Sequence, residues 1–216
     1  MTQSHNGISA LFDLDGVIVD TEPSYTRFWH TTGQKYNLSP TFATDIKGTT
    51  LNDILNRHFP PTLHDQVKHE IWQYEETMEY ILFPGAIELL RSLREAGIPT
   101  AIVTSSDNTK MSYLYRQHPE LPELVDTIIT GDLVTKSKPD PQGYLLAASR
   151  LNCEPTRSFV IEDSLQGLKA GKAAGATTIG ISTTLPPEVI APFSDLLVSS
   201  IAEIPLDFFS LSMYKK

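Results

Sequence analysis

The chain has 216 residues, of which 40% are hydrophobic and 20% are charged, and its formal net charge is −9 at pH 7. This is ordinary globular composition, which excludes fibrous and disordered chains. The negative charge leaves no overall basic surface, so we expect no nucleic-acid partner. No run of 18 apolar residues and no basic-then-apolar leader pattern is present, so we expect neither export nor a membrane partner.

The number of cysteines also bears on the cellular compartment. Cys153 is the single cysteine, so an intrachain disulfide and a cysteine metal cluster are both excluded. A reducing compartment fits this usage. We therefore expect a cytoplasmic protein, and nothing in the sequence predicts an obligate protein partner.

Short apolar runs rich in β-branched residues alternate with helix-like stretches along most of the chain. The runs span residues 8–12, 100–103, 127–129, 158–161, 177–181 and 196–198, and they are typical of buried strands. Ser164 is placed to cap a helix that ends near Gly175. Alternation of this kind predicts an α/β fold with a parallel sheet.

The interval 23–83 breaks this alternation, because it contains helical patterns and no convincing buried strand. We interpret it as a small helical domain inserted after the first strand, with residues 1–22 and 84–216 forming the α/β core domain. Apolar and aromatic positions are spaced to fill the core of a small helical bundle. They are Phe28, Trp29, Leu51, Ile54, Leu55, Ile71, Trp72, Tyr74, Met78 and Ile81.

The first predicted strand runs directly into two acids, Asp13 and Asp15, followed by Gly16. Acidic residues rarely close a buried strand for structural reasons. In open parallel sheets the carboxyl ends of the strands form the ligand crevice, and a glycine lets the chain turn sharply away from it. A plain turn remains an alternative interpretation of the pair alone, since aspartate and glycine are common turn formers.

Three further segments carry polar side chains at matching places. Thr104 and Ser105 follow the strand at 100–103 and supply hydroxyl groups, and Lys138 precedes a proline further along. The strand at 158–161 ends in Glu162 and Asp163. If the strand ends converge, these acids repel one another by roughly 4 kcal/mol for each pair of unit charges at 4 Å, taking an effective dielectric of 20. A hard divalent cation relieves this repulsion, and Mg²⁺ suits a set of oxygen ligands.

Four motifs in this order resemble the haloacid dehalogenase superfamily, in its branch of sugar phosphatases and β-phosphoglucomutases. They are the segments at 13–22, 103–106, 138–141 and 161–164. The resemblance covers nearly the whole chain, and it implies a Rossmann-like core with a helical cap domain. It also implies a magnesium-dependent phosphatase acting on a small phosphorylated metabolite, such as a sugar phosphate.

The resemblance assigns roles to residues of this chain. Asp13 would be the nucleophile that becomes an aspartyl phosphate, and Asp15 the general acid and base. Thr104 and Lys138 would hold the phosphoryl oxygens. Magnesium would be bound by Asp13, by the backbone carbonyl of Asp15 and by Asp163, with Glu162 acting through a water.

Two further residues are also implied as contacts of the substrate. Lys47 stands in a Lys-Gly-Thr-Thr segment that would form a cap loop facing the site, and Glu22 resembles an acid that sugar phosphatases carry after the first motif. A solvated surface lysine remains the alternative for Lys47.

Two other functions use similar residues. A β-phosphoglucomutase shares the machinery, but by alignment its cap histidine, cap arginine and second-motif lysine fall at Tyr25, Leu51 and Asp107. Leucine cannot replace an arginine that binds a second phosphate, which favours hydrolysis over mutase action.

A non-enzymatic phosphoaspartate signalling domain carries comparable acids, threonine and lysine, but it has no cap. A dehalogenase has no evident use for Asp15 or the fourth-motif acids.

Overall fold

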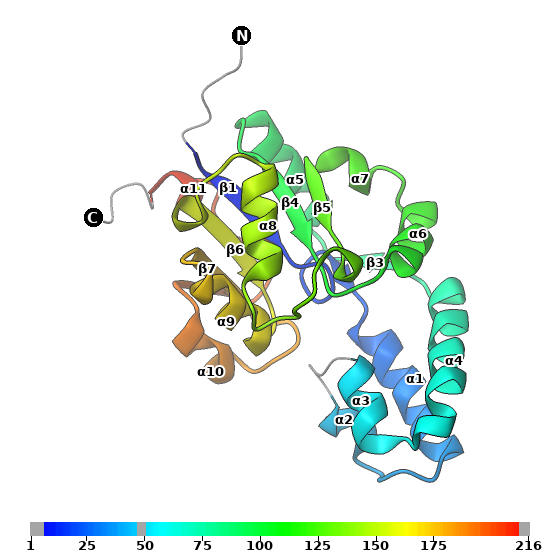
Figure 1. Ribbon diagram of the computed structural model, residues 1–216. Coiled ribbons are helices and arrows are strands. Elements are labelled where there is room, and N and C mark those ends of the chain that lie inside the picture. The colour runs from blue at the N-terminus through cyan, green and yellow to red at the C-terminus, as the bar shows by residue number, and fades with distance from the viewer. Residues whose placement is uncertain (1–6, 47–50, 212–216) are drawn as a thin grey trace. The chain divides into compact units, whose positions relative to one another are not determined.

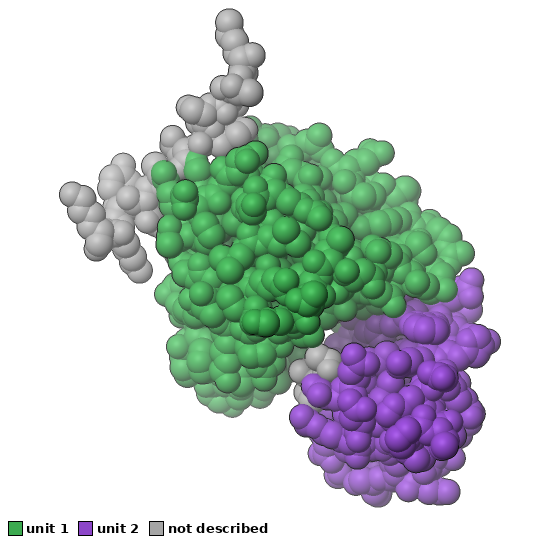
Figure 2. Space-filling view, viewed as in Figure 1, with its two compact units in different colours: residues 1–20, 81–216 green, residues 21–80 purple. Residues whose placement is uncertain are grey.

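The computed structural model describes residues 7–46 and 51–211, and the chain divides into two compact units (Figure 2). The α/β unit comprises Met1–Asp20 and Ile81–Lys216, and the helical unit comprises Thr21–Tyr80. The predicted borders lie a few residues further along the chain. In the structure the helical unit begins directly after β2 (Val19–Asp20) and ends directly before β3 (Ile81–Leu82), and these two strands pair as a short antiparallel sheet within the α/β unit. Strands of two residues have no readable sequence period, so neither was predicted.

Six parallel strands form the main sheet of the α/β unit (Figure 1). In spatial order they are β5 (Thr127–Ile129), β4 (Thr100–Val103), β1 (Ser9–Phe12), β6 (Ser158–Glu162), β7 (Thr177–Ile181) and β8 (Leu196–Val198). The chain adds β4 and β5 on one side of β1, then continues with β6, β7 and β8 on the other. Because the connections leave β1 and β6 in opposite directions, the carboxyl ends of these two strands mark the ligand crevice of such a sheet.

The predicted α/β class is confirmed, but two predicted strands are less buried than expected. β5 and β8 were both predicted as buried strands, and most of their residues are only half-buried. They lie at the two edges of the sheet, where one side of each strand has no neighbouring strand. The apolar runs identified these strands, but the sequence carries no signal for their edge position.

Helices cover the sheet on both faces (Figure 1). The helices of the α/β unit are α5 (Ala86–Glu95), α6 (Asn108–Gln117), α7 (Leu121–Leu124), α8 (Gln142–Arg150), α9 (Leu165–Ala173), α10 (Pro187–Ile190) and α11 (Phe208–Leu211). Short 3₁₀ turns are η2 (Gly131–Leu133), η3 (Pro155–Arg157), η4 (Ala191–Phe193) and η5 (Ile201–Glu203). Among the described residues, no helix combines the length and the apolar character needed to span a membrane.

Strand side chains alternate between two apolar layers, as the period of a strand requires. On one face Leu11 and Val160 pack in a cluster with Tyr144 of α8 and Ala170 of α9. On the other face the ring of Phe159 lies with its centroid 4.9 Å from that of Phe209 in α11. Strands covered on both faces are fully apolar in sequence until they end, so a charged residue at a strand end stands out.

The helical unit consists of α1 (Glu22–Lys35), α2 (Phe42–Asp45), α3 (Leu51–His58), the turn η1 (Pro61–Leu63) and α4 (His64–Thr77). Its core is rich in aromatic rings, and Phe42 contacts both Trp29 and Phe59 in edge-to-face geometry. Phe42, Phe59 and Val67 are buried there without having been predicted. Two predicted core residues are wrong, since Trp72 is 41% exposed and Ile81 is 53% exposed. Trp72 follows the buried Ile71 along α4, and successive residues of a helix point in different directions.

Candidate active site

The register of the sheet brings the predicted acids together at one edge. Phe12 pairs with Ile102 of β4 on one side and with Ile161 of β6 on the other. The next residue, Asp13, donates its backbone N–H to the carbonyl of Ile161. Asp13 therefore lies level with Glu162, the last residue of β6.

The turn after Asp13 depends on a glycine. Gly16 has a φ of +80°, and its backbone N–H donates to the carbonyl of Val19. A Cβ atom at this position would lie 2.0 Å from Oδ2 of Asp163. Glycine is required here for two reasons, the backbone conformation and the close approach of the Asp163 carboxylate.

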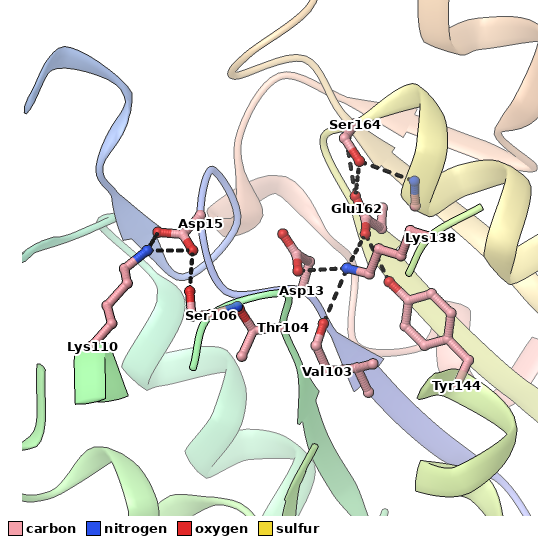
Figure 3. A network of polar contacts seen from close by, with 11 residues as sticks. Asp13, Asp15, Val103, Thr104, Ser106, Lys110, Lys138, Tyr144, Glu162 and Ser164 are labelled. Carbon is pink, nitrogen blue, oxygen red and sulfur yellow. Dashed lines mark hydrogen bonds and ion pairs between the residues drawn. The ribbon is translucent and has the colours of Figure 1, made fainter. Parts of the chain in front are cut away.

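Lys138 lies at the centre of the strand ends (Figure 3). Its Nζ donates to Oδ1 of Asp13 at 2.6 Å, to Oε1 of Glu162 at 2.6 Å and to the carbonyl of Val103 at 3.1 Å. Burial opposes the charge on the Lys138 ammonium, but Asp13 and Glu162 outweigh it and raise its pKa well above the usual value. Burial also raises the pKa of Asp13 to about 7, against the lowering effect of Lys138. One ammonium thus only partly offsets the buried carboxylates around it.

Glu162 is completely buried and is held by several donors. Its Oε1 accepts from Lys138 and, at 2.8 Å, from the hydroxyl of Tyr144, while its Oε2 accepts from the hydroxyl of Ser164 at 2.8 Å. Ser164 also caps α9 as predicted, accepting from the backbone N–H of Gly167 at 3.0 Å. A Cβ atom on Gly167 would lie 1.7 Å from Oε1 of Glu162, so α9 approaches this carboxylate very closely. Tyr144 was missed in the sequence because its spacing in α8 is that of an ordinary core residue.

Three carboxylates could hold a metal ion. Asp13, Glu162 and Asp163 each offer an oxygen within 4.8 Å of the others. Burial raises the pKa of Asp163 well above its usual value, and the charges of Glu162 and Asp13 raise it further. Buried carboxylates that disfavour their own charge fit a hard cation with oxygen ligands, as the sequence predicts for Mg²⁺. The side chain of Asp15 is not part of this group, and its predicted contact through the backbone carbonyl stays a prediction.

Asp15 instead belongs to a second cluster. Nζ of Lys110 donates to Oδ1 and Oδ2 of Asp15 at 2.7 and 2.8 Å, and the hydroxyl of Ser106 donates to Oδ2 at 3.0 Å (Figure 3). Lys110 is a buried lysine on α6, and the sequence analysis did not identify it. An early position in the helix after the second motif was its only signal, because a lysine there is usually a solvated one.

The other predicted site residues differ in where they lie. Thr104 is buried at the end of β4, and its hydroxyl accepts from the backbone N–H of Ser106 at 3.0 Å, whereas Ser105 is exposed. Glu22 belongs to the helical unit, where its Oε1 accepts from the hydroxyl of Thr26 at 3.0 Å. Lys47 lies outside the described residues.

A family model described as haloacid dehalogenase-like hydrolase matches residues 10–181 of the chain. The chain belongs to this family. This haloacid dehalogenase-like hydrolase is 30% identical to validoxylamine A 7′-phosphate phosphatase of Streptomyces hygroscopicus subsp. limoneus, over 90% of the chain and 94% of the relative. It is 33% identical to hexitol phosphatase A of Escherichia coli (strain K12), over 80% and 82% respectively.

Solved structures share the fold of this hydrolase. A crystal structure of a HAD hydrolase of family IA, variant 3, from Entamoeba histolytica HM-1:IMSS matches with a TM-score of 0.84 at 24% identity, over 96% of this chain and 99% of that one. The predicted family and fold class are confirmed by these comparisons. The chain is therefore an enzyme of a hydrolase family.

Proposed function

We propose that this hydrolase is a magnesium-dependent phosphatase that releases orthophosphate from a small phosphorylated metabolite, a sugar or polyol phosphate. The observation that carries the proposal is the cluster at the ends of β1 and β6, where Asp13 and Glu162 share Lys138 beside Asp163. Both relatives described above are named as phosphatases, and one is a hexitol phosphatase.

Mg²⁺ would be held by the carboxylates of Asp13 and Asp163 and by the backbone carbonyl of Asp15, with Glu162 acting through a water. Glu162 suits the outer position, because both of its oxygens already accept hydrogen bonds from the protein. The cation, when bound, would neutralise the acidic cluster and polarise the phosphoryl group.

The chemistry proceeds in two displacements. A carboxylate oxygen of Asp13 forms a bond to phosphorus while the bond to the leaving oxygen breaks, and Asp15 gives that oxygen its proton. Asp15 then takes a proton from a water that attacks the aspartyl phosphate, and orthophosphate leaves with Asp13 restored. Lys138 fixes the orientation of the nucleophile through Oδ1, and together with Thr104 it would stabilise charge on the phosphoryl oxygens.

Recognition of the rest of the substrate is assigned to the exposed Ser105 and to the helical unit acting as a cap. Glu22 and Lys47 are the proposed contacts from that unit. Closure of a cap over the site would exclude bulk water from the aspartyl phosphate and let the bound substrate hydroxyls select the substrate.

The side chains at three positions, where a β-phosphoglucomutase carries a histidine, an arginine and a lysine, favour hydrolysis over mutase action. Tyr25, at the place of the mutase histidine, donates its hydroxyl to Oε1 of Glu75 at 2.7 Å within the helical unit. Leu51 packs against the aromatic core of that unit, and the side chain of Asp107 caps α6 by accepting from the backbone N–H of Lys110 at 2.8 Å. Each side chain has a structural role, and none offers a cation for a second phosphate.

The test is orthophosphate release from a panel of phosphorylated metabolites, with Mg²⁺ and with EDTA. The panel contains sorbitol 6-phosphate, hexose phosphates and glycerol 3-phosphate. It also contains β-glucose 1-phosphate with a trace of its bisphosphate, which tests for mutase action. Magnesium-dependent release from monophosphates supports the proposal. Formation of glucose 6-phosphate without release would make the chain a mutase, and a long-lived phosphoprotein without turnover would make it a signalling domain.

A further inference from the structure

The carboxylate of Asp15 is held from more than one side. Lys110 contacts both of its oxygens and Ser106 contacts Oδ2, although 30% of the Asp15 side chain remains exposed. A carboxylate on a loop turns freely about its side-chain torsions unless donors fix it. Contacts to both oxygens define the plane of the carboxylate as well as its position.

The donors are themselves firmly placed. The side chain of Lys110 is only 6% exposed, and its backbone lies in the first turn of α6, which Asp107 caps. Ser106 donates its backbone N–H to the hydroxyl of Thr104, and its carbonyl accepts from the backbone N–H of Gly131. A Cβ atom on Gly131 would lie 2.6 Å from the carbonyl oxygen of Ser105, so this loop is packed closely against its neighbour. Lys110 and Ser106 are therefore firmly placed donors for the Asp15 carboxylate.

From this geometry we infer that Lys110 is a positioning residue, which acts with Ser106 to orient the Asp15 carboxylate toward the leaving oxygen of the substrate. The inference rests on the proposed function. Asp15 lies close enough to the nucleophile for its charge to be felt there, since it raises the pKa of Asp13. An acid that must hand over a proton during bond breaking works only within a narrow range of distance and angle.

The experiment uses leaving groups that differ in their need for a proton. When the phosphorus–oxygen bond of sorbitol 6-phosphate breaks, the alkoxide oxygen must take a proton from Asp15. The oxygen of p-nitrophenyl phosphate leaves as a stabilised phenolate and needs none. The kcat/KM value reports on this first displacement, so we compare it for both substrates in the native enzyme and in Lys110→Met, at saturating Mg²⁺.

We expect Lys110→Met to lower kcat/KM for sorbitol 6-phosphate by about 100-fold, the lower end of what general acid catalysis contributes. For p-nitrophenyl phosphate the loss should stay under about fivefold, since that reaction bypasses the acid. Ser106→Ala should show the same pattern with a smaller ratio. It serves as the second variant if Lys110→Met folds poorly.

Lys172→Met is the control, because Lys172 lies on α9 of the same unit and its Nζ makes a similarly short ion pair with Oδ2 of Asp195, at 2.6 Å, on a more exposed part of the surface. Its two kcat/KM values should stay close to those of the native enzyme. Equal losses on both substrates in Lys110→Met and Ser106→Ala would reduce Lys110 to a structural role. A faster reaction with sorbitol 6-phosphate would show that Lys110 restrains Asp15, and would overturn the inference. If sorbitol 6-phosphate is not a substrate, the alkyl phosphate of the panel that the native enzyme hydrolyses fastest takes its place. If the native enzyme hydrolyses no member of the panel, the proposed function itself fails.

Discussion

The two units of the chain bury different kinds of side chain. The α/β unit buries Asp13, Lys110, Glu162 and Asp163 together with several threonines, whereas the helical unit buries mainly aromatic and aliphatic groups around Phe42. Desolvated carboxylates disfavour folding, as the raised pKa values of Asp13 and Asp163 indicate. Edge-to-face ring contacts favour it. Substitutions at the buried charged residues of the α/β unit should therefore mainly change activity, and those in the core of the helical unit should mainly change stability.

Asp13→Asn should show the largest loss of activity with the fold retained. We expect turnover to fall by more than about 10,000-fold, since removal of a nucleophile eliminates the covalent route. The fold should persist, because asparagine has nearly the same shape and one of several like charges is removed. Phosphate release and circular dichroism check the two halves. Full activity in this variant would refute the mechanism.

Asp163→Asn separates metal binding from folding. We expect activity to fall by about 100- to 1,000-fold, comparable to the loss of one group that stabilises transition-state charge. Mg²⁺ should raise the Tm of the native protein and have little effect on that of the variant. In EDTA the variant should melt above the native protein, because burial and the nearby Glu162 and Asp13 charges disfavour the Asp163 carboxylate. Phosphate release measures the activity, and thermal unfolding with and without Mg²⁺ measures the changes in Tm. An unchanged Mg²⁺ response in the variant would remove Asp163 from the metal site.

Phe42→Ala tests the helical unit. Phe42 is 2% exposed and contacts Trp29 and Phe59, so its truncation should cost about 3 kcal/mol in the free energy of unfolding. Hydrogen exchange should rise within residues 21–80 and stay low in β1 and β6.

Trp72→Ala is the control for Phe42→Ala, since Trp72 is 41% exposed and its loss should change stability by less than about 0.5 kcal/mol. An equal rise in hydrogen exchange across both units in Phe42→Ala would show that the two units unfold together, and would contradict their separate roles.

Among the substitutions near the site, Tyr144→Phe is expected to have the smallest effect on turnover. The change removes only the hydroxyl that donates to Oε1 of Glu162, which Lys138 and Ser164 still hold. We expect a loss of about 1 to 2 kcal/mol in stability. Turnover should fall less than about tenfold, the equivalent of 1.4 kcal/mol. Urea unfolding and steady-state rates check this, with Tyr113→Phe on α6 as the control. A loss as large as that in Asp13→Asn would place Tyr144 in the chemistry.

Much of the α/β unit could be predicted because local sequence carries the signal. A strand covered on both faces must be apolar along its length, so the acids that follow residues 8–12 and 158–161 stand out without any structure. Ser164 was predictable as a cap for the same reason, since capping depends on residues adjacent in the chain. These signals were sufficient to predict the fold class and to place Asp13, Glu162 and Asp163 at strand ends, and the family was inferred from the resemblance of the four ordered motifs.

Tertiary structure decided the features that depend on residues distant in the chain. The sequence could not show that β5 and β8 lie at the sheet edges, that Trp72 points outward, or that Tyr144 reaches Glu162. It also could not assign Lys110 to Asp15, because 95 positions separate them and a lysine on a helix is a surface residue by default. Residue type and local order determine which groups stand at the strand ends. Which charged groups pair there depends on how the sheet aligns segments far apart in sequence.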